Sequence, residues 1–257
     1  MRFSVLASGS AGNACYVESA HSKVLIDAGI SCREIIRRLD VIGVNPEQLD
    51  ALILTHEHSD HIKGAGPLSR RFDLPVYGNG STFKRGIKTL GGLTKPVIIH
   101  TGQSVPIHDL IVETFTKCHD AADPMGLVIS SNGMRLGLAT DLGRSTQLVE
   151  DRLRGCQALI IEFNHDEKML EDGPYPLELK KRIKGPDGHL SNLQASKLVK
   201  TVFHEDLRVV VAAHLSETNN LPEKALYEVE KALKGGEMGN TRIVLSHQDH
   251  PLPMVEV

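Results

Sequence analysis

Short runs of aliphatic and β-branched residues recur along the chain, and polar turns separate them. Runs of this length, rich in Val, Ile and Leu, are typical of strands in a protein interior. We predict strands at 24–26, 51–54, 97–99, 126–129, 136–138, 158–161, 209–211 and 243–245. Most of the core of this protein is therefore expected to lie in β-sheets.

Apolar residues at helical spacing lie between many of these strands. We predict helices at 32–39, 62–72, 82–90, 145–153, 192–203 and 222–233. The early strands follow one another closely and the helices come at intervals, which favours two mixed sheets between helical layers, an α+β fold of the αββα sandwich type, over a regular βαβ alternation. Because no repeat or low-complexity linker divides the chain, we expect a single domain over residues 1–257.

The composition is that of an ordinary globular protein with few aromatic residues. Of 257 residues, 40% are hydrophobic and only 4% aromatic, so the core must be largely aliphatic. The net charge of −3 provides no global cationic field for a polyanion. The four cysteines form no C-x-x-C pair, which argues against a disulfide framework or a zinc knuckle. With no apolar run that could span a bilayer and no signal-peptide core, we expect a cytoplasmic protein with no membrane association.

A string of potential metal ligands follows the strand predicted at 51–54. Residues 56–61 read H-E-H-S-D-H, and a helix is predicted to begin at Ile62. Imidazole and carboxylate are ligands that zinc accepts, and the oxygen donors also suit manganese or iron. His56 and His58 can reach one ion, while Asp60 and His61 turn toward a second. The string therefore predicts a dinuclear metal site between a strand and a helix.

This string resembles the signature of the metallo-β-lactamase superfamily, and the resemblance extends over nearly the whole chain. It implies that Asp27 orients a ligand histidine, and that His119 completes the first ion's ligands beside His56 and His58. It also implies that Asp141 bridges two divalent ions, Zn²⁺ or Mn²⁺ with iron as the alternative, and that His214 joins Asp60 and His61 on the second.

Five further segments resemble one bacterial branch of that superfamily, the YycJ/WalJ-type hydrolases. They are residues 7–13, 118–124, 164–166, 188–192 and 214–220. The branch resemblance implies a phosphodiesterase or nuclease that acts on nucleic acid, DNA in preference to RNA, with 5′-exonuclease activity. One departure is Phe163, where a small polar residue is expected. The sequence leaves the oligomeric state and the physiological metal open.

Cleavage of a phosphodiester by a metal-activated water also requires a proton for the leaving oxygen. We predict Asp60, His189 and His165 as catalytic residues, with His189 the first candidate for the general acid because Ser191 is a plausible N-cap of the next helix. For His165 the alternative is a core-edge histidine bonded to Asp166. The basic residues at 180–184 could hold the polymer or form a solvated helix face, and the loop at 8–13 could contact phosphate or be a simple hairpin turn.

Other reactions and roles compete with phosphodiester hydrolysis. The same water could attack a thioester or another carboxyl derivative, as in a glyoxalase II-like hydrolase. An oxygen-reducing flavodiiron role is disfavoured, because His58 stands where those proteins carry a glutamate. A regulatory module with a structural metal is also disfavoured, since such sites are usually closed sets of cysteine and histidine.

Overall fold

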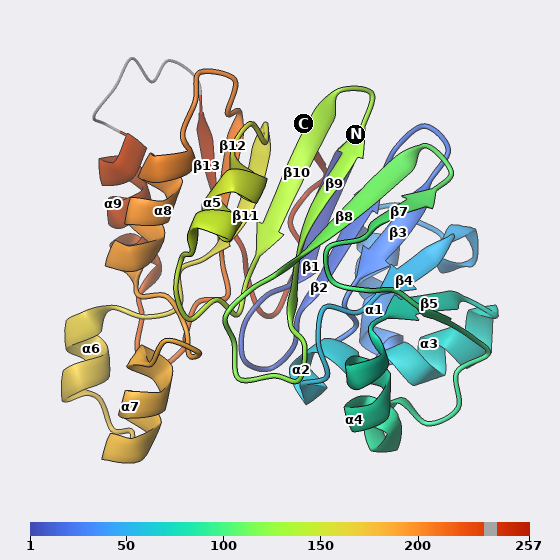
Figure 1. The fold of residues 1–257 in the computed structure, drawn as a ribbon, viewed down its shortest axis with the longest axis horizontal. Helices are drawn as coiled ribbons and strands as arrows, with labels where there is room; N and C mark the ends of the chain where they lie inside the picture. Colours follow the sequence, from blue (N-terminus) through green and yellow to red (C-terminus); the bar gives the residue numbers. More distant parts are fainter. Residues whose placement is uncertain (234–240) are drawn as a thin grey trace.

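Two seven-stranded sheets lie against each other in the computed structural model, which describes residues 1–233 and 241–257 (Figure 1). The first sheet has the spatial order β14 (Val255–Glu256), β1 (Arg2–Ala7), β2 (Ala14–Glu18), β3 (Lys23–Ile26), β4 (Ala51–Ile53), β5 (Pro75–Gly78) and β6 (Lys95–Ile98). The second has the order β13 (Arg242–Leu245), β12 (Val209–Ala213), β11 (Ala158–Glu162), β10 (Met134–Ala139), β9 (Met125–Ser131), β8 (Leu110–Thr116) and β7 (Ser104–Ile107). These are the two mixed sheets that the hydrophobic pattern predicts.

The two sheets share one pattern of strand pairing. In each, an antiparallel part leads into a parallel part: β1, β2 and β3 are antiparallel and β3 to β6 parallel. Likewise β7 to β10 are antiparallel and β10 to β13 parallel. Parallel neighbours need a crossover connection, so the helices gather in the parallel parts. The carboxyl ends of the parallel strands of one sheet therefore lie at one edge.

Helices connect the parallel strands and cover the outer faces of the sandwich (Figure 1). On the first sheet these are α1 (Cys32–Val41), the short 3₁₀-helix η1 (Pro46–Gln48), α2 (Ser59–Ile62), α3 (Ala65–Phe72) and α4 (Gly80–Leu90). On the second they are α5 (Gln147–Leu153), α8 (Asn192–Val202) and α9 (Pro222–Leu233), while α6 (Glu167–Asp172) and α7 (Leu177–Lys184) lie beyond the end of the sheet, below its strands in Figure 1. In the part of the chain that is described, no helix combines the length and apolar character needed to cross a bilayer.

The core has three layers of mostly aliphatic side chains. One layer lies between the two sheets, and the others lie between each sheet and its helices. Side chains of strand β11 alternate between two of these layers. Ile160 packs between the sheets, whereas Leu159 and Ile161 pack under the helices. A continuous apolar run is expected where a strand is buried on both faces.

Every predicted strand overlaps an observed one, but one predicted helix is wrong. The stretch 62–72 is two helices, α2 and α3, which meet at Gly64. The Gly64 N–H donates to the Ala28 carbonyl at 2.6 Å, and a Cβ atom there would lie 2.4 Å from the Ile30 carbonyl oxygen. The approach of the loop after β3 therefore breaks the helix. The pattern also missed the short or partly polar elements β1, β2, β5, β7, β8, β14, α6 and α7.

Candidate metal centre

The candidate ligands follow the ends of strands that meet at one edge of the sandwich. The 56–61 string follows β4, and His119 follows β8. Asp27, Asp141 and His214 follow β3, β10 and β12, and their φ angles are 57°, 53° and 55°. This left-handed conformation costs a non-glycine residue about 1–2 kcal/mol, although Asp and His tolerate it better than most. Three strained strand ends at one edge indicate a site whose geometry is maintained by its surroundings.

The string itself enters a helix earlier than predicted. Helix α2 begins at Ser59 with His58 as its N-cap, so Asp60 and His61 lie in its first turn. Backbone bonds from neighbouring loops hold that turn: the N–H groups of Asn13 and Ala28 donate to the carbonyls of Asp60 and His61, each at 2.7 Å. The turn is thus anchored to the loops after β1 and β3.

Three histidines form the first donor cluster. His58 Nδ1 lies 3.2 Å from both His56 Nε2 and His119 Nε2. Ligand nitrogens about 2.0–2.1 Å from a tetrahedral zinc ion would lie about 3.3–3.4 Å apart. The observed spacing fits a metal ion among the three nitrogens.

Hydrogen bonds to the other ring nitrogens define which atoms of this cluster can bind a metal. His119 Nδ1 faces the Gly188 carbonyl at 3.3 Å, which can only accept, so the proton belongs on Nδ1. Thr55 Oγ1 donates to Asp27, and therefore accepts from Nδ1 of His56 at 3.0 Å. In both rings Nε2 is left with a free lone pair. Burial lowers the pKa of His56 well below its usual value and that of His119 to about 4. Both imidazoles are therefore neutral at physiological pH, and each can offer the Nε2 lone pair to a metal ion.

The second donor cluster contains two carboxylates and two histidines. His61 Nε2 lies 3.2 Å from Asp141 Oδ2 and 3.6 Å from Asp60 Oδ2. His214 Nε2 lies 3.5 Å from Asp141 Oδ1, and that oxygen is also 3.9 Å from His119 Nε2. Asp141 therefore stands between the two clusters, as the resemblance implies for a bridging carboxylate.

Two buried atoms of the second cluster lack a hydrogen bond in the described part of the chain, although other site residues lie close to them. Asp141 Oδ2 and His214 Nε2 are buried and accept or donate no hydrogen bond within residues 1–233 and 241–257. Buried polar atoms are rarely left this way, because desolvation without a bond is costly. Together with the nitrogen and oxygen donor set, these orphaned atoms fit a divalent cation.

Asp27 lies where the resemblance expects a positioning carboxylate. Its Oδ2 contacts His61 Nδ1 at 2.8 Å, and its Oδ1 accepts from the Thr55 N–H at 2.8 Å. Burial opposes protonation of His61, but the carboxylates of Asp141 and Asp27 outweigh it and raise the pKa of this histidine well above its usual value. Without a metal ion the second cluster therefore holds a proton, which shows how strongly it favours positive charge.

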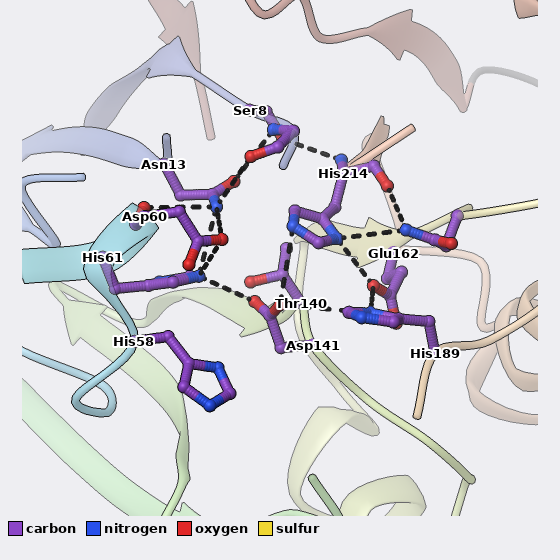
Figure 2. A network of polar contacts seen from close by, with 12 residues as sticks. Ser8, Asn13, His58, Asp60, His61, Thr140, Asp141, Glu162, His189 and His214 are labelled. Carbon is purple, nitrogen blue, oxygen red and sulfur yellow. Dashed lines mark hydrogen bonds and ion pairs between the residues drawn. The ribbon is translucent and has the colours of Figure 1, made fainter. Parts of the chain in front are cut away.

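Glu162 is a site residue that the sequence analysis missed. It is fully buried, and its Oε1 contacts Nδ1 of both His189, at 2.7 Å, and His214, at 2.8 Å (Figure 2). Its Oε2 accepts the N–H groups of Leu142 and Leu190. The sequence did contain a signal: Glu162 ends the apolar strand β11, where its carboxylate is expected to be buried. A buried carboxylate needs polar partners, so this position pointed to a site residue.

His189 lies against both clusters, as expected of a group that acts on the substrate. Its ring centroid is 5.3 Å from those of His119 and His214. Burial would lower its pKa, but the Glu162 carboxylate raises it to about 9. The predicted N-cap is confirmed: Ser191 caps α8 and forms a capping box with Gln194. With Asp141, Glu162 and His214, His189 also belongs to a third group of close potential ligands.

His165 occupies a different environment. It lines a cavity of about 280 Å³ with Glu167, Ser191 and other polar residues, and none of these lines the cavity beside His189. Burial lowers the pKa of His165 to about 4. The proposed bond to Asp166 is wrong, since Asp166 caps α6 and pairs with Lys224. The structure does not bring His165 into the donor clusters, and its catalytic role stays a prediction.

The loop at 8–13 supports the histidines rather than offering its N–H groups to phosphate. Five of its N–H groups already donate hydrogen bonds: those of residues 8, 11 and 13 to other segments, and those of residues 9 and 12 within the loop. Ser8 Oγ accepts from the His214 N–H at 2.7 Å, and Asn13 Nδ2 lies 3.1 Å from His61 Nε2 (Figure 2). The loop thus links the first sheet to a ligand of the second.

Phe163, the departure from the expected pattern, points away from the site. Its side chain is fully buried in the layer between the second sheet and its helices. Its neighbour Asn164 contacts the His214 carbonyl at 3.1 Å. The large side chain at this position therefore contributes to the core and leaves the site unchanged.

Comparisons with known proteins agree with this geometry. The sequence pattern of the Metallo-beta-lactamase superfamily matches residues 7–156. Exodeoxyribonuclease YycJ of Bacillus anthracis is 37% identical over 236 residues, which cover 91% of this chain and 89% of the relative. Exodeoxyribonuclease WalJ of Streptococcus pneumoniae is 32% identical over 263 residues, covering 100% and 98%.

A solved structure shows the same arrangement of sheets and helices. The metallo-beta-lactamase fold protein YhfI from Bacillus subtilis aligns with a TM-score of 0.74 at 18% identity, over 98% of both chains. At this identity the likeness concerns the fold alone. With the strand-end donor clusters, the matching sequence pattern and full-length relatives at 32–37% identity, the chain belongs to the metallo-β-lactamase superfamily, in the branch of YycJ and WalJ.

Proposed function

We propose that this protein is a phosphodiesterase that degrades DNA from a strand end with the help of two divalent metal ions, Zn²⁺ or Mn²⁺. One observation carries the proposal: two donor clusters share Asp141, and His189 lies against both. Two adjacent ions with a nearby acid suit in-line displacement at phosphorus. The relatives named as exodeoxyribonucleases support DNA as the polymer.

The donor sets divide between the two ions without conflict. His56, His58 and His119 would hold one ion, and Asp60, His61 and His214 the other, with Asp141 between them. When bound, the two ions activate a water and neutralise charge on the phosphate. The protein's own part is to fix the donor atoms, through Asp27 behind His61 and Glu162 behind His214.

His189 would deliver the proton that the leaving oxygen needs. The Glu162 carboxylate raises the pKa of His189 to about 9 in the metal-free protein and fixes Nδ1, so that Nε2 is the nitrogen free to face a substrate. A positioned acid of this kind contributes about 10²–10⁴-fold to a rate. We therefore assign the acid role to His189 and not to His165.

The basic residues of α7 contribute less than their number suggests. Arg182 is paired with Asp120, Lys181 with Glu178, and Lys180 Nζ donates to the Glu171 carbonyl. The ion pairs of Lys181 and Arg182 offset part of the positive charge that α7 presents to a polyanion. The protein would thus hold DNA chiefly at the reacting phosphate rather than along a basic groove.

Metal analysis combined with digestion of defined substrates tests the proposal. We expect about two divalent ions per chain and stepwise degradation of 5′-phosphorylated single- or double-stranded DNA, faster than degradation of RNA of the same sequence. His58→Ala should abolish the activity, and a chelator should do the same to the unaltered protein. Degradation by the variant as fast as by the wild type would assign the activity to a contaminant.

The same preparation decides the thioester alternative. We expect bis(p-nitrophenyl) phosphate to be hydrolysed faster than a glutathione thioester under identical metal loading. A faster thioester reaction would replace the phosphodiesterase assignment with a glyoxalase II-like one.

A further inference from the structure

A cavity of about 260 Å³ opens directly beside the candidate metal centre. His189 lines the cavity, and its ring centroid lies 5.3 Å from those of His119 and His214, so this side chain is shared by the cavity and the donor clusters. One wall is apolar and consists of Tyr175, just before α7, with Leu179 and Ile183 on α7 itself. Hydroxyl and amide groups of other segments, including Asn164 and Ser216, line it as well. The cavity therefore offers both an aromatic surface and hydrogen-bonding groups.

Bonds to the loop of a candidate ligand hold the α7 wall in place. Arg182 forms an ion pair at 2.5 Å with Asp120, the residue after His119. The Asp120 N–H donates to the Asp187 carbonyl at 2.9 Å, and the His189 N–H donates to the Ile183 carbonyl at 2.9 Å. These bonds tie the carboxyl end of α7 to residues of the site. The cavity is preformed, which reduces the ordering cost of binding.

The chemistry of the cavity favours a nucleoside. An aromatic ring with an aliphatic neighbour provides a stacking surface, which any nucleobase can use because every base has a flat face. The Asp120 carboxylate of the cavity is paired with Arg182, and the uncharged side chains of Asn164 and Ser216 provide hydrogen-bonding groups for a base or a sugar. Its volume is just below the roughly 300–1,000 Å³ of small-molecule pockets, enough for one nucleoside but not for a length of strand.

We propose that this cavity receives the terminal nucleoside of the strand whose adjoining phosphate lies at the metal centre, with the base stacked on Tyr175. This inference rests on the proposed function and makes it more specific, since Tyr175 becomes a binding determinant for the strand end. A site that accommodates one nucleoside beside the reacting phosphate would favour cleavage from an end over cleavage within a strand.

Binding measurements separate the base from the phosphate. The metal-loaded protein is titrated calorimetrically with a deoxynucleoside 5′-monophosphate and with deoxyribose 5-phosphate, which lacks the base. We expect the nucleotide to bind about 5- to 100-fold more tightly, the range that base–aromatic stacking supplies. Tyr175→Ala should remove most of this preference, and Tyr175→Phe, which keeps the ring, should retain it. Tyr227→Ala, which removes a 60% exposed tyrosine on α9, is the matched control and should also retain it.

Each outcome decides the inference independently of the proposed function. Equal binding of both ligands by the wild type, or a full base preference in Tyr175→Ala, would overturn the nucleoside cavity. Digestion of 5′-phosphorylated DNA by the same wild-type preparation is measured in parallel. A base preference without DNA digestion would contradict the nuclease assignment, whereas digestion without a base preference would contradict only the cavity.

Discussion

The two halves of this molecule share one strand-pairing pattern but supply their site residues in different ways. In the first sheet, four candidate donors come from one six-residue string after β4. In the second sheet, each donor comes alone from a different strand end: His119 after β8, Asp141 after β10 and His214 after β12. Each donor cluster combines residues of both halves. Neither half can therefore form a complete metal site until the two sheets have packed together.

Each half also places a buried carboxylate behind its histidines, and the two carboxylates differ in the number of histidines that they contact. Asp27 contacts one histidine, His61, whereas Glu162 contacts both His189 and His214. The second half therefore couples a candidate ligand to the candidate proton donor through one side chain. This coupling predicts that damage to the second half will disturb both metal binding and proton transfer.

The largest loss of activity is expected from a substitution of Asp141, the side chain that both donor clusters share. Asp141→Asn removes charge from the one side chain that serves both clusters, so phosphodiester hydrolysis should fall by about 10³-fold or more. The bound metal should fall below two ions per chain. The matched control is Asp249→Asn, which changes an exposed aspartate and should keep full activity and metal content. Normal metal content and activity in Asp141→Asn would refute the shared-ligand arrangement.

The second prediction concerns proton transfer and distinguishes two histidines of the second half. His189→Ala should slow DNA hydrolysis by about 10²–10⁴-fold. It should slow bis(p-nitrophenyl) phosphate hydrolysis much less, because p-nitrophenolate leaves without a proton. His165→Ala should change the two rates equally and slightly. A leaving-group-dependent loss in His165→Ala, with none in His189→Ala, would transfer the acid role to His165.

The third prediction compares the two buried carboxylates. Asp27→Asn and Glu162→Gln should each weaken metal binding by about 10–100-fold, as loss of a carboxylate behind a ligand histidine typically does. Glu162→Gln should have the larger effect, because Glu162 supports two histidines and two backbone N–H groups. Competition with a chromogenic chelator measures both affinities. The reverse ranking would show that the first half contributes more to metal binding.

The smallest effect, a change in thermal stability, is expected from a substitution at a contact between the two sheets far from the site. Asp109, between β7 and β8, accepts from Ser19 Oγ at 2.5 Å and Ser22 Oγ at 2.6 Å in the turn between β2 and β3. These hydroxyl bonds lower the pKa of Asp109 to about 2. Asp109→Asn should lower the melting temperature by about 2–4 °C at pH 7.

The pH dependence of that difference follows from the sign of the pKa shift. A carboxyl group whose pKa is lowered by folding stabilises the folded state above its ordinary pKa, and this contribution is lost as the pH falls through the folded value. The gap between wild type and Asp109→Asn should therefore close between about pH 4 and pH 2. Glu178→Gln, at an exposed position on α7, should show no comparable gap at any pH. A gap that persists at pH 2 would exclude the carboxylate as its source.

The β-rich sandwich could be predicted from local pattern alone, because apolar runs of strand length need only local periodicity to be recognised. The donor string at 56–61 could be predicted in the same way, since four ligands within six residues are visible without a fold. The positioning carboxylate Asp27 and the single donors His119, Asp141 and His214 came from family resemblance, because one histidine or aspartate after a strand carries little local signal. Short strands such as β5 and β14 were missed since their pairing, and not their composition, makes them strands.

Which side chains meet depends on the packing of the whole chain. Glu162 gained its role because β11 lies between β10 and β12, which places its carboxylate between His189 and His214. The split of the predicted helix at Gly64, the separate cavity at His165 and the Tyr175 wall also depend on contacts between distant segments. Local sequence pattern encodes periodicity and burial, whereas proximity across the sheet edge depends on how the whole chain packs.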